Sequence, residues 1–164
     1  MILVTIGSLL AYYFWPSKKL PKEARIDFIE VWKSKRKMDV FGNGKLLKTY
    51  RIALGKNPGG RKEFEGDNRT PEGSYLINAR NPNSKFYKNL GISYPNESDL
   101  RHAEALGKPA GGDIKIHGLR NGRGYRGKFH RLKNWTAGCI AVTNSEMDEL
   151  FESVTDNARI TIHP

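Results

Sequence analysis

Alternating apolar and polar side chains dominate the chain after residue 25. Ile26–Trp32 is rich in β-branched and aromatic residues, and similar short segments follow at Met38–Phe41 and Leu46–Leu54. Asn43-Gly44 separates the last two, and this dipeptide favours the positive φ angles of a tight hairpin turn. The pattern therefore predicts a β-meander at the start of the folded region.

Strand signals become more widely spaced farther along the chain. Residues 55–73 are dense in glycine, proline and charge, which predicts a loop, and regular periodicity fades over 81–112. The same alternation predicts further strands over Tyr75–Ala79, Asp113–His117, Cys139–Val142 and Arg159–His163. A loop rich in glycine and arginine is expected between the second and third of these.

Two helices are expected between the strands. The first is short, ends near Leu106 and could be capped by Ser98 or Asp99. The second follows a capping box that begins at Thr143, and its apolar residues recur at helical intervals as far as Val154. The sequence therefore predicts a mainly β domain, α+β only in a minor sense, with one good helix in the C-terminal region and short helices in loops.

The first fifteen residues, MILVTIGSLLAYYFW, carry no charged side chain. As a helix they would span roughly 22 Å, less than the roughly 30 Å of a bilayer core. That length is typical of a signal-peptide h-region or a short signal anchor, and no A-x-A cleavage pattern follows. We expect an uncleaved anchor over 1–15, a linker over 16–25 and one extracytoplasmic domain over 26–164. A cleaved signal and a buried core helix are the alternatives.

The charge balance favours anionic partners. Lys and Arg total 28 against 17 Asp and Glu, which gives a net charge of +11. Nucleic acid, an anionic cell-wall polymer and acidic lipid would all fit this charge. Because the aromatic residues Trp32, Phe64 and Trp135 do not interleave with basic residues in a reading motif, we expect no nucleic-acid partner. A basic module that binds the cell wall without catalysis remains a possible function.

Cys139 is the only cysteine in 164 residues. Structural cysteines of exported proteins come in pairs, so a single thiol indicates a reactive group, unless it is an inert buried side chain. The period-two rule places Cys139 opposite the aliphatic residues of its strand, and it does the same for His117. If the two strands are neighbours, the imidazole could activate the thiol. Backbone amides around Gly138 and Cys139 could then hold an oxyanion.

Other chemical signals are weaker. His130 lies among basic residues, where a surface role is expected, and His102 and His163 are interpreted as structural or exposed. The few possible ligands contain no close pair, so neither a metal nor another cofactor is expected. Gly122–Gly127 matches G-x-G-x-x-G, but no helix is expected to open at its last glycine, so a dinucleotide site is rejected.

The motifs together resemble a known family. His117-Gly118 is followed by Thr136-Ala137-Gly138-Cys139, and the flanking stretches read GDNRTPEGSY, ISYPNESD and CIAVTNSEMDEL. This combination resembles the YkuD-type L,D-transpeptidases, in particular their YafK-like subgroup, over about residues 26–164.

The resemblance implies a YkuD-like β-sandwich or barrel that acts on peptidoglycan stem peptides outside the cytoplasm. Cys139 would attack the carbonyl of the L-centre of diaminopimelate, His117 would activate the thiol, and the Gly118 carbonyl would orient His117. Backbone amides of Gly138 and Cys139 would hold the oxyanion. Further candidates for substrate binding are Thr136, Trp135, Tyr94, Arg120 and Arg123.

The fate of the acyl group stays open. An amine acceptor would give transpeptidation, whereas water would give hydrolysis, either of a stem peptide or of the link to a wall-bound protein. Many members of the family have a histidine before Gly-Cys and a polar residue two positions after the cysteine. This chain has Ala137 and Ala141 there, so the family motif does not identify the acceptor.

Overall fold

The computed structural model describes residues 2–164, with side chains described from residue 7 onward. One eight-stranded sheet forms the body, in the order β3-β2-β1-β8-β4-β5-β6-β7. Its strands are β1 (Ile26–Trp32), β2 (Lys37–Gly42), β3 (Lys45–Arg51), β4 (Gly73–Ser84), β5 (Tyr87–Ile92), β6 (Lys115–His117), β7 (Ile140–Ala141) and β8 (Val154–His163). Only the β1–β8 and β6–β7 pairs are parallel. The meander and its turn at Asn43 are confirmed, and Asn43 has a φ of 50°.

The two edges of the sheet meet. Just beyond β3, the Ala53 N–H donates to the Ala141 carbonyl at 3.0 Å, and the Ala141 N–H donates back to Ala53 at 2.8 Å. Gly55 forms a further parallel bridge to Thr136. Since Ala141 belongs to β7, the sheet curls round until its last strand lies beside the continuation of its third. The expected mainly β fold, described as a sandwich or barrel, is therefore confirmed, and its sheet has the form of a half-barrel.

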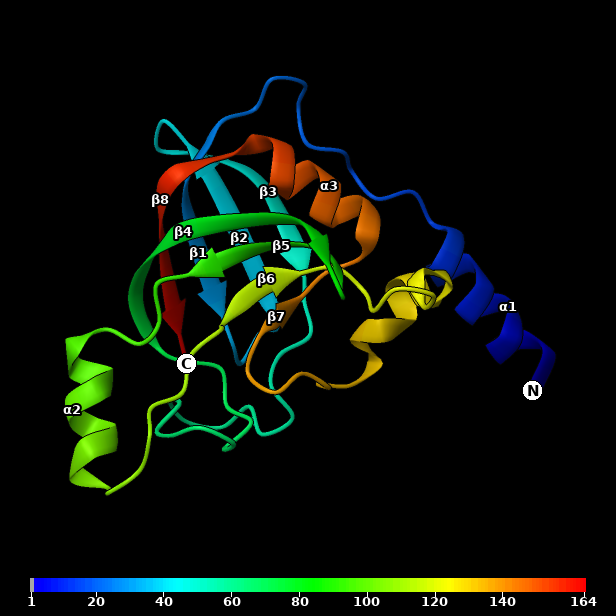
Figure 1. The fold of residues 1–164 in the computed structure, drawn as a ribbon. Coiled ribbons are helices and arrows are strands. Elements are labelled where there is room, and N and C mark those ends of the chain that lie inside the picture. The colour runs from blue at the N-terminus through cyan, green and yellow to red at the C-terminus, as the bar shows by residue number, and fades with distance from the viewer. Residues whose placement is uncertain (1) are drawn as a thin grey trace.

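The core lies inside this curled sheet. Alternate residues of the strands point inward, as the apolar pattern predicted, and α3 (Asn144–Ser153) adds Met147 and Leu150. Both side chains are fully buried, and Figure 1 shows α3 lying across the strands. Fully buried side chains from the strands include Ile26, Ile29, Met38, Leu90, Ile116, Ile140 and Ile160.

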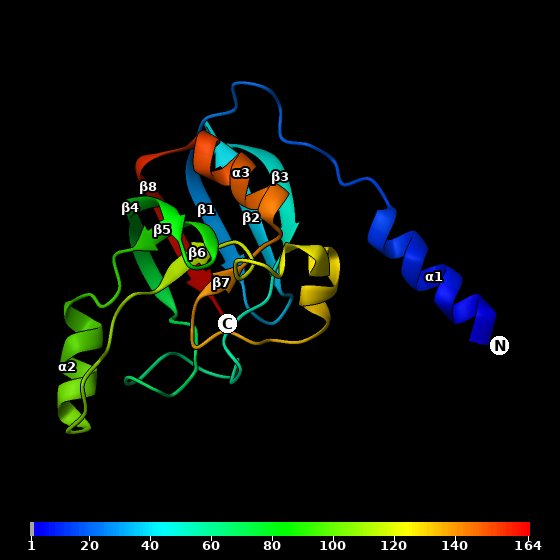
Figure 2. The ribbon, with the colours of Figure 1, turned by 45° about the vertical axis from the view of Figure 1, so that its right-hand side comes forward.

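Helices α1 (Ile2–Phe14) and α2 (Glu97–Ala105) lie on opposite sides of the body in both views (Figures 1 and 2). Most of the large apolar side chains described in and just after α1 are exposed and only Tyr13 among them is half-buried, which makes the alternative of a buried core helix wrong. The exposed side chains are Leu9, Leu10, Tyr12, Phe14 and Trp15. Among the described residues, no helix has both the length and the apolar character needed to cross a membrane.

Strand β5 lies in a segment where no regular periodicity indicated a strand. It pairs with β4 on one side and with β6 on the other, and its last four residues are buried. Asn89 and Gly91 lie within it, and both residue types have weak strand propensity. A Cβ on Gly91 would come within 2.9 Å of the Ala79 side chain, so glycine is needed for close packing. Tertiary contacts therefore outweigh local propensity here.

Three smaller expectations are corrected. The cap of α2 is Asn96 rather than Ser98 or Asp99; Asp99 instead occupies the third helical position and closes the capping box. The 3₁₀ helix η1 (Gly124–Leu132) occupies part of the expected loop. Strand β8 begins at Val154, directly after α3, rather than at Arg159.

The capping box of α3 provides a test of the fold. The Thr143 hydroxyl donates to the Glu146 carboxylate at 2.8 Å and accepts from the Glu146 amide, and both side chains are buried. Thr143→Ala should lower the free energy of unfolding by about 1–2 kcal/mol in urea denaturation. Glu152→Ala, at an exposed position of the same helix, should change it by less than about 0.5 kcal/mol. Equal losses in the two variants would contradict this role of the cap.

Candidate active site

The candidate site is formed where β6 and β7 lie side by side. Their register pairs Ile116 with Ile140 and His117 with Ala141. Both isoleucines are in the core, so the alternate residues of each strand point to the other face. Cys139 precedes β7 by one residue and falls on the same face as His117. Neighbouring strands lie about 4.8 Å apart, and each residue along a strand adds about 3.3 Å. The Cα atoms of Cys139 and His117 are therefore diagonal neighbours about 8 Å apart.

One hydrogen bond determines the chemical form of His117. Its Nδ1 lies 2.7 Å from the Gly118 carbonyl oxygen, and a carbonyl oxygen can only accept. Nδ1 must therefore carry the proton, which leaves Nε2 with a lone pair in the neutral ring. This is the tautomer that a general base requires.

The surroundings of His117 keep the imidazole neutral. The side chain is 5% exposed, and its ring lies 4.8 Å from that of Phe86 and 5.7 Å from that of Trp135. Burial lowers the pKa of His117 below its ordinary value, and the bond to Gly118 only partly opposes this effect. The ring is therefore poised to accept a proton rather than already charged.

Cys139 is partly exposed and lies outside the hydrophobic core. Its thiol donates to the Asp113 carbonyl oxygen at a sulfur-to-oxygen distance of 3.5 Å. Burial raises the pKa of Cys139, whereas the backbone amide and the positive charge of Lys115 act in the opposite direction. The Lys115 ammonium also lies 3.2 Å from the Asp113 carboxylate. Cys139 is therefore not the inert buried cysteine that was the alternative.

Thr136 shapes the turn that presents the thiol. Its hydroxyl accepts from the Gly138 amide at 3.1 Å and donates to the Cys139 carbonyl at 2.7 Å. Gly138 has a φ of 137°, and a Cβ there would approach the Arg69 carbonyl oxygen to 2.7 Å, so only glycine fits. Because the Gly138 amide is already engaged, it would have to exchange or share this bond in order to hold an oxyanion.

Asn144 supports the turn after His117. Its side-chain oxygen accepts from the Leu119 amide at 2.8 Å, and a Cβ on Gly118 would come within 2.9 Å of that oxygen. Asn144 is the first residue of α3, so the helix start holds the His117-Gly118 segment in place. No motif in the sequence pointed to this role of Asn144, although the residue directly follows Thr143 of the predicted capping box.

The remaining predicted substrate-binding residues lie in different environments. Trp135 lies beside the His117 ring, whereas Tyr94 is buried and its hydroxyl donates to the Ala110 carbonyl at 3.0 Å. Arg120 and Arg123 are exposed, and neither forms an ion pair within the described part of the chain. Trp135 is thus next to the candidate base, and Tyr94 serves as a core residue.

His130 is not the surface residue that its basic neighbours indicated. It is buried, its Nδ1 accepts from the Trp135 indole at 3.5 Å, and burial together with the Arg131 charge lowers its pKa to about 3. His102 faces Glu63 at 3.5 Å, and His163 stacks on Trp32. Within residues 2–164, no three His, Cys, Asp or Glu side chains are grouped to hold a metal.

Comparison with known proteins identifies the family of the chain. The family model of the YkuD L,D-transpeptidase catalytic domain matches residues 26–162. The chain belongs to the YkuD family. The match includes both strands of the candidate site and the curled sheet except for the last residue of β8, so the resemblance inferred from the motifs is confirmed.

The individual relatives share less than a third of their aligned residues with this chain. The chain is 29% identical over 136 residues to the provisionally named L,D-transpeptidase YafK of Escherichia coli K12, an alignment covering 78% of this chain and 47% of that protein. It thus spans about half the length of the curated relatives it matches. Pgp2 of Campylobacter jejuni, a helical cell shape determining protein, aligns with a TM-score of 0.65 and 24% identity over 96% of this chain and 54% of its own. Bd1075 of Bdellovibrio bacteriovorus aligns with a TM-score of 0.58 and 24% identity, over 89% of this chain and 51% of its own.

The charge at Lys115 provides a test of the environment of the thiol. Lys115→Met removes a charge that favours the thiolate, so the pKa of Cys139 should rise and its alkylation by iodoacetamide at pH 7 should slow severalfold. Lys115→Arg should preserve the wild-type profile of rate against pH, as should Lys45→Met in the exposed β2–β3 hairpin. An unchanged profile in Lys115→Met would show that the lysine does not influence the thiol.

Proposed function

We propose that this domain catalyses cysteine-dependent acyl transfer on peptidoglycan stem peptides, as an L,D-transpeptidase. The observation that carries the proposal is the hydrogen bond from His117 Nδ1 to the Gly118 carbonyl. It leaves Nε2 as the basic nitrogen, on the sheet face that also carries the lone cysteine. Membership of the YkuD family supports the same reaction class.

In the proposed first step, Nε2 of His117 takes the thiol proton, and the Cys139 sulfur attacks the carbonyl at the L-centre of a diaminopimelate residue. The backbone amide of Cys139, with that of Gly138 if it exchanges its bond to Thr136, holds the oxyanion of the tetrahedral intermediate. The intermediate collapses to a thioester as the C–N bond breaks. The D-residue leaves as an amine after taking the proton from the imidazolium.

In the second step, an acceptor attacks the thioester while His117 removes its proton, and the thiol is regenerated. An amine from a second stem peptide forms a new amide bond and a cross-link. Water gives a carboxylate and a shortened peptide, or releases a protein that had been joined to the wall. Ala137 and Ala141 occupy positions beside the cysteine, and they offer no polar side chain to select the acceptor.

The substrate also determines where the protein would act. Peptidoglycan lies outside the cytoplasmic membrane, and the L,D-transpeptidase family is extracytoplasmic, so we place the domain there. Residues 1–15 would tether it to the inner membrane. No cofactor is required by the steps above, because the thiol, the imidazole and the backbone amides supply each proton transfer and each charge stabilisation.

Mass spectrometry of the acyl-enzyme tests this function. Incubation with muropeptides that carry tetrapeptide stems should add the mass of the donor without its terminal D-residue to the wild-type protein. Cys139→Ala should form no adduct, and His117→Gln should form it at least a hundredfold more slowly, since general-base catalysis typically contributes about 10²–10⁴ in rate. Ser145→Ala, at an exposed position of α3, is the matched control and should react normally.

The products separate the candidate activities. Accumulating peptide dimers would indicate transpeptidation, and shortened monomers would indicate hydrolysis. If the wild type forms no adduct but binds cell walls, with steep salt dependence and equally well as Cys139→Ala, the domain is instead a basic binding module and the catalytic proposal is wrong.

A further inference from the structure

A second possible binding site lies away from the thiol, at the base of α1. A cavity of about 570 Å³ opens between the end of this helix, the beginning of the linker, η1 and the ends of β2 and β3. Its size falls in the range of small-ligand sites, roughly 300–1,000 Å³. The residues that line it include Tyr12, Trp15, Arg36, Arg51, Lys128 and Arg131.

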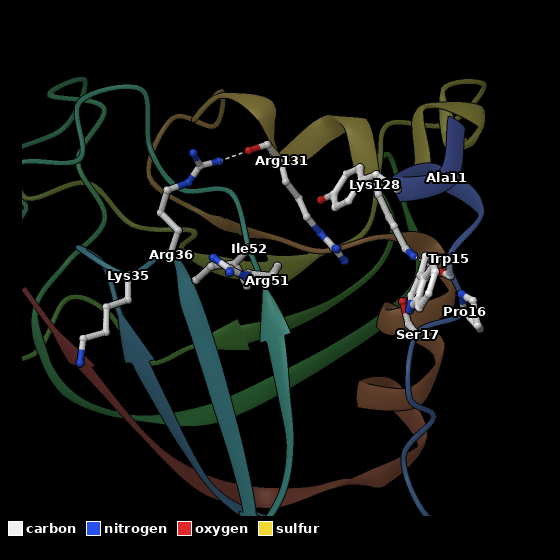
Figure 3. Close-up of a pocket in the computed structure, with 11 residues that line it drawn as sticks. Ala11, Trp15, Pro16, Ser17, Lys35, Arg36, Arg51, Ile52, Lys128 and Arg131 are labelled. Carbon is white, nitrogen blue, oxygen red and sulfur yellow. Dashed lines mark hydrogen bonds between the residues drawn. The ribbon is translucent and has the colours of Figure 1, made fainter. Parts of the chain in front are cut away.

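The lining of this cavity is strongly cationic. Five of its residues are Lys or Arg, the fifth being Lys35, and none is acidic. Only Arg131 has a carboxylate partner within residues 7–164: it bonds Glu146 at 2.6 Å. Figure 3 shows Lys35 pointing away from the others, whereas Arg131 reaches from η1 toward the strand ends that carry Arg51. The cavity therefore has an excess of positive charge that no carboxylate in the described chain balances.

Two buried nitrogens in this lining also lack partners. The Nε atoms of Arg36 and Arg131 form no hydrogen bond to any described residue, although Arg36 donates through Nη2 to the Arg131 carbonyl. These Nε atoms have almost no accessible surface, so a ligand in the cavity would contact the outer nitrogens of the same guanidinium groups instead. Guanidinium groups match the oxygens of a phosphate particularly well.

The apolar side chains next to the cavity indicate where such a phosphate would come from. Leu9, Leu10 and Phe14 of α1 are exposed, and Trp15 and Tyr12 are exposed at the rim of the cavity itself. The Lys128 ammonium lies 6.0 Å from the centroid of the Tyr12 ring and donates to the Trp15 carbonyl. Aromatic and basic residues that lie together beside an exposed apolar surface are typical of protein segments at the headgroup region of a membrane.

We propose that this cavity binds the phosphate of an anionic phospholipid headgroup. Arg51 and Lys128, which form no ion pair with any described residue, supply most of the attraction, and Arg36 and Arg131 add two further guanidinium groups to the lining. The α1 side chains contact the acyl region. Binding there would hold η1, which contacts α1 through Tyr13, close to the membrane surface.

Vesicle co-sedimentation of the full chain tests this proposal. Vesicles of equal parts phosphatidylglycerol and phosphatidylcholine should bind the wild type more tightly than vesicles of phosphatidylcholine alone. Arg51→Gln with Lys128→Gln should weaken binding to the anionic vesicles roughly 25-fold, since each basic residue near such a surface contributes roughly a factor of five. Arg51→Lys with Lys128→Arg, which keeps both charges and controls for folding, should bind like the wild type.

A charge-matched control separates a defined site from general attraction. Lys45→Gln with Lys85→Gln removes two exposed lysines from elsewhere on the body and should have little effect. The proposal is wrong if this control loses as much affinity as the cavity variant. It is also wrong if inorganic phosphate binds the cavity but phosphatidylglycerol gives no preference, because the site would then serve a soluble anion. Neither result involves the thiol, so the vesicle assay does not depend on the proposed reaction.

Discussion

The pairing of β6 with β7 is the constraint on which the candidate site depends. Each of these strands is very short, and the register between them sets which side chains face the core. A slip of one residue would bury Cys139 and turn Ile140 outward, because the side-chain period is two. The hydrogen bonds between Ala53 and Ala141 hold β7 from its other side. Closure of the sheet therefore fixes the thiol on the face that carries the imidazole.

Burial favours the neutral form of both the Cys139 thiol and the His117 imidazole. Burial raises the pKa of the thiol and lowers that of the imidazole, so proton transfer between them separates charge in a poorly solvated environment. The backbone amide and the positive charge of Lys115 both stabilise the thiolate and so reduce this cost. The depressed pKa of His117 also affects stability. The unfolded chain binds more protons than the folded one as pH falls through the ordinary histidine range, so acidification destabilises the fold.

Local patterns in the sequence predicted most of the strands, because strand periodicity follows from short-range rules. The period of two placed Cys139 and His117 correctly on the faces opposite the aliphatic residues, and the capping box located α3. Strand β5 could not be found in the same way, because Asn89 and Gly91 have weak strand propensity and are held between β4 and β6, the latter of which is distant in sequence. The burial of His130 and the cationic cavity also depend on which segments meet in the folded chain.

The tautomer and position of His117 are the central claim, and nitrogen NMR of its ring tests them most directly. Long-range ¹H–¹⁵N correlation at pH 7 should show a neutral imidazole with the proton on Nδ1. Capping the Cys139 thiol with a methylthio group should then shift the Nε2 resonance while the Nδ1 resonance stays in place. A proton on Nε2, a charged ring, or an Nε2 signal that ignores the capped thiol would contradict the account.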